Sequence, residues 1–259
     1  MLRAAGLAKR FGGVRAVHDV TLEIAAGTVH SIIGPNGAGK TTLLNLLSGI
    51  ERPDLGEIFF EGAALSGAPP HRFAAAGIGR TFQNLQIFFN MSALENVMAG
   101  AWLHQACGLA SALLRLPRLA RAEHRAREEA RALLEFVGLA RWMHAASDAM
   151  PYGALKRLEI ARALAARPRL LLLDEPAAGL NPTEARELDG LIRRIAARGV
   201  TVVLVEHNMR VVMEVSDHVF VMNRGRLLSE GTPREICADQ PVTRAYLGSR
   251  SERQARAYA

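Results

Sequence analysis

The stretch GPNGAGKTT, residues 34–42, restricts what this chain can fold into more than any other feature of the sequence. It fits the phosphate-loop pattern G-x-x-x-x-G-K-[ST], it follows the apolar run VHSII, and it opens TTLLNLLSG, which is typical of a helix. Its glycines let the backbone curl with the N–H groups pointing inward, and the helix dipole adds positive potential. We therefore predict a strand, loop and helix that bind nucleotide phosphates, with a chance glycine-rich turn as the alternative.

The same stretch predicts how a nucleotide is held. Lys40 is expected to reach the outer phosphates, and the hydroxyl group of Thr41 is expected to bind Mg²⁺. None of the three lysines follows an asparagine, so the N-K-x-D stretch on which guanine specificity rests in signalling GTPases is absent, and ATP is favoured. The predicted ATP-binding residues of the loop are Gly34, Pro35, Asn36, Gly37, Ala38, Gly39, Lys40, Thr41 and Thr42.

A second predicted part of the site is the acidic end of the run RLLLLDEP. A buried strand would deliver Asp174 and Glu175 at its carboxyl end, beside the phosphate loop. Asp174 suits Mg²⁺, and Glu175 suits the role of general base for an attacking water. An acidic pair at the end of a strand is also a common turn signal, and that is the alternative for this motif taken alone.

The order of strand-like segments predicts a parallel α/β core. Apolar, β-rich stretches occur at residues 14–24, 29–33 and 56–62, and the last resembles an edge strand bounded by glycines. The later runs RLLLLDEP and VTVVLVEH are continuous and apolar, which is typical of buried parallel strands. These runs flank a long strand-poor region, so the core is interrupted by a helical insertion.

Helical patterns and caps are expected in the middle and the later part of the chain. Residues 118–138 have apolar residues at helical spacing. Asn181 is expected to cap a helix with Glu184 at its third position, and Thr232 is expected to cap another. The sequence Asn-Arg-Gly at 223–225 predicts a hairpin turn.

These segments are expected to form a single domain, residues 1–259. Within it, residues 1–83 and 166–259 would make the nucleotide-binding core, and residues 84–165 would make the helical subdomain. Residues 240–259 would form a basic C-terminal tail.

Composition supports a folded protein. The chain has 259 residues, 49% of them hydrophobic, and a net charge of +7, which fits an anionic partner or an arginine-rich solvated face. Its two cysteines, Cys107 and Cys237, indicate neither a disulfide framework nor a thiolate metal site. The N-terminus lacks the apolar stretch of a signal peptide, and no uncharged apolar run approaches the roughly 18 residues needed to span a bilayer.

The two motifs, together with RTFQN, VEHNM and MPYGALKRLEIARAL, resemble the ATP-binding subunit of an ABC transporter over nearly the whole chain. The resemblance implies an α/β fold: a P-loop NTPase core with a parallel sheet, an N-terminal antiparallel β region and an inserted α-helical subdomain. It also implies that Gln83 senses Mg²⁺ and the attacking water, and that His207 contacts the γ-phosphate and braces Glu175. Phe11 would stack on adenine. Ordinary surface or core positions are the alternatives for Gln83 and His207, and simple packing is the alternative for Phe11.

In this family a segment that is commonly Leu-Ser-Gly-Gly-Gln caps a helix pointing at the ATP held by a second subunit. Here the segment is MPYGA, in which proline replaces serine and alanine replaces glutamine. This departure favours two unequal ATP sites in a heterodimer, although a homodimer and a proline that merely starts a helix stay open. Asn181 stands where an aspartate is frequent, in a loop tied to communication across the dimer. The residues expected to face the partner's nucleotide are Pro151, Tyr152, Gly153 and Ala154.

One branch of the family, the ATPases of branched-chain amino-acid importers, is similar in RTFQNLQIFFNMSALENVMAG and the closing AYLG. Urea and short-chain amide importers and the lipopolysaccharide-export ATPase are alternatives. The resemblance implies a second ATPase subunit, two membrane permease subunits, a periplasmic or extracellular solute-binding protein, and a peripheral place at the cytoplasmic face of the inner (plasma) membrane. Permease docking is expected at the apolar residues after the glutamine, with core packing as the alternative: Leu85, Ile87, Phe88 and Phe89.

Two other classes of function fit less well. A soluble ABC-type ATPase acting on nucleic acid would be expected to have a long coiled coil or a second cassette, and this chain has one phosphate loop and neither extension. No nucleic-acid partner is therefore expected. A nucleotide-binding regulator without turnover is disfavoured because Glu175 and His207 are both present.

Overall fold

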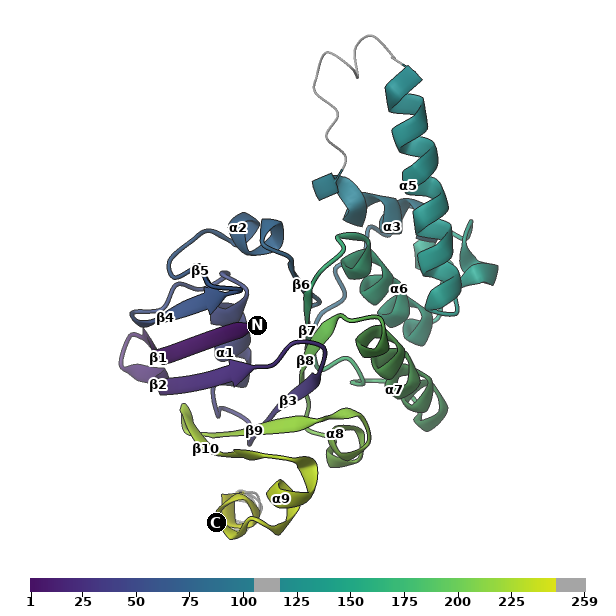
Figure 1. Cartoon of the computed structure of the whole chain (residues 1–259). Helices are drawn as coiled ribbons and strands as arrows, with labels where there is room; N and C mark the ends of the chain where they lie inside the picture. The colour runs from purple at the N-terminus through teal and green to yellow at the C-terminus, as the bar shows by residue number, and fades with distance from the viewer. Residues whose placement is uncertain (105–116, 246–259) are drawn as a thin grey trace.

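The computed structural model describes residues 1–104 and 117–245. Cys107 and the tail beyond residue 245, with most of the closing AYLG, lie outside the described residues. The described residues form two β-sheets (Figure 1). The first has the strand order β2-β1-β4-β5 and is antiparallel, with β1 Leu2–Phe11, β2 Val14–Ile24, β4 Leu55–Phe60 and β5 Ala63–Ala64.

The second sheet has the order β10-β9-β3-β8-β7-β6. Its strands are parallel except for the antiparallel pair β9 and β10. The central strands come from distant parts of the sequence, because β3 lies between β8 and β9. The strands are β3 Val29–Ile33, β6 Ile78–Arg80, β7 Leu170–Asp174, β8 Thr201–Val205, β9 His218–Asn223 and β10 Arg226–Gly231.

Helices surround the parallel sheet, and α5 projects away from the rest of the molecule (Figure 1). Helices α3, α5 and α6 pack against one another. No helix in the described part of the chain combines the length and the apolar character needed to cross a bilayer. The helices are α1 Lys40–Leu47, α2 Pro70–Ala75, α3 Ala93–Gly100, η1 Ala101–His104, α5 Pro117–Phe136, η2 Ala140–Trp142, η3 Ser147–Ala149, α6 Tyr152–Ala165, α7 Pro182–Ala197, α8 Met209–Val215 and α9 Pro233–Ala238.

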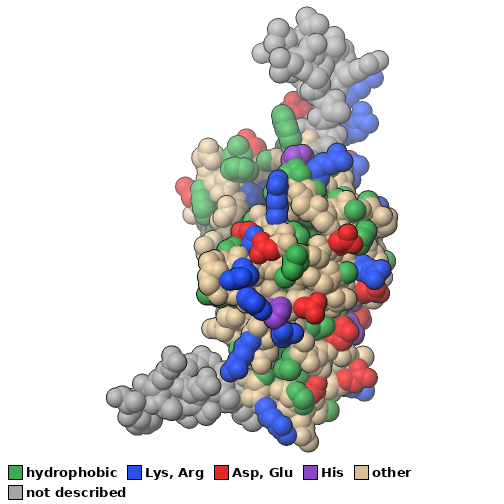
Figure 2. Space-filling view, turned by 90° about the vertical axis from the view of Figure 1, so that its left-hand side faces the viewer, with side chains coloured by type: hydrophobic (Ala, Val, Ile, Leu, Met, Phe, Trp, Pro, Cys, Tyr) green, Lys and Arg blue, Asp and Glu red, His purple; other side chains and the backbone are tan. Residues whose placement is uncertain are grey.

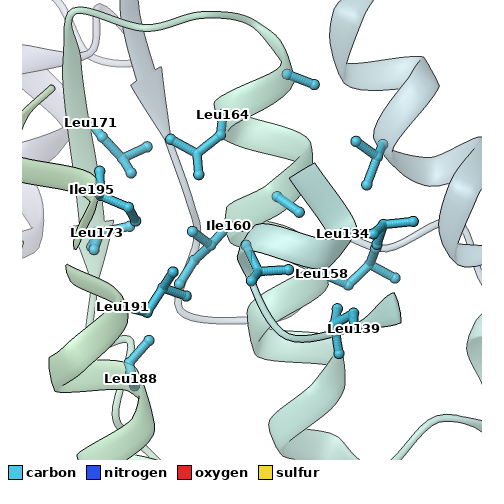
Figure 3. Packing of buried hydrophobic residues seen from close by; sticks show 14 of the residues in the cluster. Leu134, Leu139, Leu158, Ile160, Leu164, Leu171, Leu173, Leu188, Leu191 and Ile195 are labelled. Atoms are coloured by element: carbon cyan, nitrogen blue, oxygen red, sulfur yellow. The ribbon is translucent and has the colours of Figure 1, made fainter. Parts of the chain in front are cut away.

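The core has two large parts because alternate residues of a strand point to opposite faces of the sheet. Leu171 and Leu173 of β7 face the cluster formed with α5, α6 and α7 (Figure 3). Leu170 and Leu172 of the same strand face a cluster with α1 and the antiparallel sheet. All five residues of β7 are buried, as expected for a parallel strand covered on both faces.

Several predicted elements are confirmed. The helix expected at residues 118–138 is α5, and the hairpin turn at 223–225 joins β9 and β10. Asn181 and Thr232 cap α7 and α9, and each belongs to a capping box. The structure also bears out the parallel core that was predicted from the buried runs.

The stretch 56–62 differs from its prediction. It was expected to be an edge strand, but β4 lies between β1 and β5. The cause is local, because Glu61 and Gly62 have positive φ angles of 49° and 81° and turn the chain back so that β5 pairs with Phe59 and Phe60. Residues 84–165 contain helices and no strand in their described part, but their standing as a separate subdomain stays a prediction.

Candidate functional site

Residues 34–39 join β3 to α1, as predicted, and two of the glycines there are required by close contacts. Gly34 and Gly39 have φ angles of 152° and 99°. A Cβ atom at Gly34 would lie 2.2 Å from the carbonyl oxygen of Met222, and one at Gly39 would lie 2.2 Å from that of Ala16. No side chain fits at either position, so the backbone of the loop is packed between β9 and β2.

Lys40 is folded back over this loop. It is 7% exposed, and its Nζ atom donates hydrogen bonds to the carbonyl oxygens of Gly34 (2.8 Å) and Pro35 (3.1 Å). Burial lowers the pKa of Lys40, whereas the nearby carboxylates of Glu175 and Asp174 act in the opposite direction. The charged end of Lys40 is thus held at the loop, where a phosphate group would sit.

The loop also contacts the C-terminal hairpin. The N–H group of Gly225 donates to the carbonyl oxygen of Ala38 at 2.9 Å, and the N–H group of His18 donates to that of Gly225 at 2.7 Å. The turn between β9 and β10 therefore fixes the middle of the phosphate loop. Asn36, Gly37 and Thr41 are exposed, and Pro35 and Thr42 are half-buried.

Three predicted catalytic residues converge at the end of β7. Gln83 Nε2 donates a hydrogen bond to Glu175 Oε2 at 3.1 Å, and His207 Nδ1 lies 4.0 Å from Glu175 Oε1. The backbone of Glu175 has a φ of 47°, and its N–H group bonds to the carbonyl oxygen of Val205 at 3.0 Å. The three side chains come from different segments, and the fold brings them together. Their catalytic roles stay predictions.

Asp174, the predicted Mg²⁺ ligand, has a partner that sequence reasoning missed. Its carboxylate is almost fully buried, and its Oδ2 atom lies 3.1 Å from Arg80 Nη2. Arg80 also donates from Nη1 to Ser48 Oγ at 2.8 Å. Burial raises the pKa of Asp174, and the guanidinium group of Arg80 opposes that rise. Position in the sheet could have indicated the pair, because β6 and β7 are parallel neighbours.

Of the residues predicted to hold Mg²⁺, Thr41 fits such an ion, whereas Asp174 is 2% exposed and is paired with Arg80. The hydroxyl group of Thr41 is exposed and has no hydrogen-bond partner among the described residues. The described part of the chain contains no group of three or more His, Cys, Asp or Glu side chains that could hold a metal. A Mg²⁺ ion bound with a nucleotide takes most of its ligands from phosphates and water, so one hydroxyl group and one carboxylate are enough.

Two further buried carboxylates were missed by sequence reasoning. Glu206 is 1% exposed and accepts hydrogen bonds from the N–H groups of Ala177 (3.0 Å) and His207 (3.3 Å). Glu159 of α6 is 3% exposed and contacts the segment that carries Gln83. The contacts that bury these residues join distant segments, because Ala177 lies 29 positions from Glu206 and Phe82 lies 77 positions from Glu159.

Phe11 ends β1 and leaves 46% of its surface exposed. Lys9 Nζ lies 5.4 Å from the centre of its ring. The hairpin that carries Phe11 reaches the phosphate loop through Ala16, whose carbonyl oxygen lies against Gly39. Figure 2 views the side of the molecule on which the β1–β2 and β9–β10 hairpins end, and Lys and Arg side chains gather there around a histidine. Stacking of Phe11 on adenine stays a prediction.

The MPYGA segment forms the start of α6. Pro151 occupies the N-cap position and makes no side-chain cap bond. Gly153 is packed so closely that a Cβ atom there would lie 2.4 Å from Glu184 Oε1, and the ring of Tyr152 lies against Gly179. Pro151 and Tyr152 are exposed, whereas Ala154 is 1% exposed and belongs to the core. Within this chain, the part of the segment that can face a partner is therefore Pro151, Tyr152 and the backbone at the helix start.

Asn181 serves as the N-cap of α7. Its Oδ1 atom accepts hydrogen bonds from the N–H groups of Thr183 and Glu184, each at 3.0 Å. In turn, the Oε2 atom of Glu184 accepts a hydrogen bond from the N–H group of Asn181 at 3.0 Å. The same Glu184 packs against Gly153, so the two segments predicted to face the second subunit are in contact.

The glycine loop, the buried lysine and the acidic end of a parallel strand define the class of this protein: it is a P-loop nucleotide-binding protein. Residues 17–178 match the family model described as ABC transporter. This chain therefore belongs to the ABC transporter family, and the α/β fold with a parallel sheet and an N-terminal antiparallel sheet that the resemblance implied is confirmed.

Similar proteins cover nearly the whole chain. The chain is 43% identical over 249 residues to the high-affinity branched-chain amino acid transport ATP-binding protein BraF of Pseudomonas aeruginosa, with 96% of this chain and 98% of that protein covered. It is 42% identical over 249 residues to the protein of the same description, LivG, of Escherichia coli, with the same coverage. Among solved structures, the ADP conformation of MJ1267, an ATP-binding cassette of an ABC transporter, is 30% identical with a TM-score of 0.83, and the match covers 96% of this chain and 98% of that one.

Proposed function

We propose that this chain is the ATP-hydrolysing subunit of an ABC importer. The observation that carries the proposal is the meeting of Gln83, His207 and Glu175 at the end of β7, next to a phosphate loop that holds Lys40. A carboxylate, an amide and an imidazole so placed can orient and deprotonate a water molecule beside a bound triphosphate.

Each residue has a role in the proposed reaction. The loop amides and Lys40 bind the phosphates, and Phe11 stacks on the adenine ring. Glu175 takes a proton from water as the water oxygen attacks the terminal phosphorus, which releases ADP and phosphate. Thr41, Gln83 and Asp174 would hold Mg²⁺, which neutralises phosphate charge when it is bound. His207 contacts the terminal phosphate and supports Glu175.

Substitution of Glu175 tests this proposal. Glu175→Gln keeps the shape of the side chain and removes its ability to accept a proton. We expect kcat at this chain's own ATP site in the assembled transporter to fall by about 100-fold or more, with ATP binding retained. The matched control is Glu187→Gln, which changes an exposed glutamate that pairs with Arg157 at 2.7 Å. Full turnover by Glu175→Gln would remove Glu175 from the mechanism.

The transported solute is inferred from the relatives. We propose a branched-chain amino acid, because BraF and LivG, which match along nearly their full lengths, are described as proteins of such transport systems. Urea or a short-chain amide is the alternative solute. The proposed assembly contains a second ATPase subunit, two permease subunits and a solute-binding protein, with this chain at the cytoplasmic face of the inner membrane. Uptake of labelled leucine or urea by the reconstituted system separates the two solutes.

The proposed docking site of the permease follows Gln83. A hollow of about 570 Å³ is lined by residues of α6 and of the segment after Gln83, including Phe88 and Arg162. Phe88 and Phe89 are each 47% exposed. Ile87 is buried, and Leu85 packs partly against the core, so these two fit the alternative of core packing.

Phe88→Asp tests permease docking. The substitution places a charge on an apolar contact surface, outside the phosphate loop. We expect ATP binding by this chain to stay unchanged and stimulation of ATP hydrolysis by the permease to fall by about tenfold or more. Nucleotide binding and hydrolysis are measured with and without permease. Stimulation equal to that of the wild type would contradict the docking proposal.

A further inference from the structure

We propose that Lys156 and Glu159 are positioning residues for ATP hydrolysis, because together they fix the backbone of residues 82–86 to helix α6 and so place Gln83 at Glu175. These residues are called the glutamine segment below. The proposal rests on the proposed function, since it assigns a supporting pair to the same hydrolytic site.

Glu159 binds both ends of the glutamine segment. Its Oε1 atom accepts hydrogen bonds from the N–H group of Phe82 at 3.3 Å and from that of Gln86 at 3.4 Å. The segment has neither helical nor strand structure, so its amides have no ladder of their own. Burial raises the pKa of Glu159, while the bond from Phe82 and the charge of Lys156 act against that rise. Burying a carboxylate is costly, so the presence of Glu159 here indicates that the hydrogen bonds it accepts are required.

Lys156 binds the middle of the same segment. Its Nζ atom donates to the carbonyl oxygen of Gln83 at 3.2 Å, and the residue is 3% exposed. Lys156 and Glu159 are three positions apart, so they lie on one face of α6. Two amides and one carbonyl group of a five-residue segment are thus held by two side chains of a single helix.

The glutamine segment is linked to Glu175 on one side and, through Lys156, to the first turn of α6 on the other. The side chain of Gln83 extends from the held backbone to Glu175 at 3.1 Å. In the other direction, Lys156 Nζ lies 5.8 Å from the centre of the Tyr152 ring, in the first turn of α6. Tyr152 is exposed and belongs to the segment proposed to face the second nucleotide. Because α6 is continuous from Tyr152 to Ala165, a shift of its first turn moves Lys156, Glu159 and the glutamine segment together.

A purely structural role is the competing explanation, and backbone amide exchange tests the contacts directly. In the nucleotide-free full chain, Glu159→Leu removes the acceptor of the Phe82 and Gln86 amides. We expect the amides of residues 82–86 to exchange with solvent about tenfold faster or more. Glu159→Gln keeps an acceptor oxygen and should stay close to the wild type. Arg157→Met, which removes an ion pair from another face of α6, is the control. Unchanged exchange in Glu159→Leu would overturn the proposal.

A double-mutant cycle tests whether the pair acts through Gln83. In the assembled transporter we expect Glu159→Leu to lower kcat about tenfold with KM for MgATP within about twofold. In a Gln83→Ala background the same substitution should have little further effect, because the group it positions is gone. An equal loss in both backgrounds would show a structural role and overturn the proposal.

Lys156→Met provides the same cycle if Glu159→Leu does not fold, since it removes the contact with the Gln83 carbonyl group, together with the charge near the Tyr152 ring, and keeps the two bonds to Glu159. The expected result and the overturning result are the same as above. Wild-type protein that does not hydrolyse ATP would contradict the proposed function, whereas the amide-exchange experiment would still decide whether Lys156 and Glu159 hold the glutamine segment.

Discussion

Glu206 lies just after β8 with 1% of its surface exposed, and its carboxylate is held by backbone N–H groups of Ala177 and His207. Burial has the largest effect and raises the pKa of Glu206. The hydrogen bond from Ala177 and the charge of His207 lower this pKa by less than burial raises it. The folded protein therefore favours the protonated form of Glu206 more than the unfolded chain does. Stability contributed by this residue is present at low pH and is lost as the pH rises through the raised pKa.

We expect Glu206→Gln to become more stable relative to the wild type as the pH rises. The glutamine side chain keeps an oxygen for the Ala177 amide and has no charge to bury. At acidic pH, where Glu206 is protonated, the two proteins should have similar free energies of unfolding. In denaturant titrations the difference should then grow as the pH rises above the ordinary pKa of a glutamate, about 4.3, and should level off above the raised pKa of Glu206. A difference that does not depend on pH would contradict this account, and Glu187→Gln, at an exposed position, is the control.

At the scale of single residues, the sequence predicted the groups whose signal is local. The phosphate loop and the Asp174–Glu175 pair each lie within a few consecutive residues, and their chemistry follows from residue type. Arg80 could not be found in this way, because its partner Asp174 lies 94 positions away. The same holds for Glu159, which lies 77 positions from Phe82. These partners are set by the packing of β6 and α6 against β7.

For helices and strands too, the sequence predicted features with a local signal and missed features that depend on distant contacts. The capping box of α7 was predicted because its two residues are three positions apart, and the structure contains it. The place of β4 inside its sheet was missed, because neighbours in a sheet depend on how the chain turns after Phe60. Tyr152 and Gly153 at the start of α6 contact Gly179 and Glu184 near the start of α7, a contact between helices that no local pattern indicates.

The cap of α7 should contribute measurably to stability. Asn181→Ala removes the acceptor for the N–H groups of Thr183 and Glu184, and we expect the free energy of unfolding to fall by about 1 kcal/mol. Asn181→Asp keeps the acceptor oxygen and should stay within a few tenths of a kcal/mol of the wild type. Urea unfolding of the three proteins measures the effect. Equal stability of Asn181→Ala and the wild type would show that the cap does not contribute.

For the whole molecule, the start of α6 is exposed and carries no side-chain cap. In the proposed dimer this segment completes the ATP site of the other subunit, while the loop, Glu175 and His207 serve this chain's own site. Because Pro151 has neither a hydroxyl nor an N–H group, the site it completes would lack one hydrogen bond to phosphate. We propose that the second ATPase subunit is a different chain, which makes the two sites unequal. The alternative is a homodimer, in which Pro151 would complete both sites.

Pro151→Ser should raise hydrolysis at the site that this segment completes. A hydrogen bond from the serine hydroxyl to phosphate would stabilise the closed state by about 1.5 to 3 kcal/mol. The measurement uses the assembled transporter with Glu175→Gln in this chain, so that only the site completed by this segment turns over. Pro151→Ala, which removes the proline without adding a hydroxyl group, is the matched control. An unchanged or lower rate for Pro151→Ser would count against the account of unequal sites.

The contact between Gly225 and Ala38 affects when the protein can fold during translation. Residues 34–42 leave the ribosome early, but β3 pairs with β8 and β9, and the turn that holds the loop is made by residues 223–225. A nascent chain that ends before His218 lacks β9 and the turn at 223–225. It would expose the whole phosphate motif beside the unpaired edge of β3, and such a surface is prone to aggregation. Nucleotide can therefore assist folding only late in translation, after nearly the entire polypeptide has emerged.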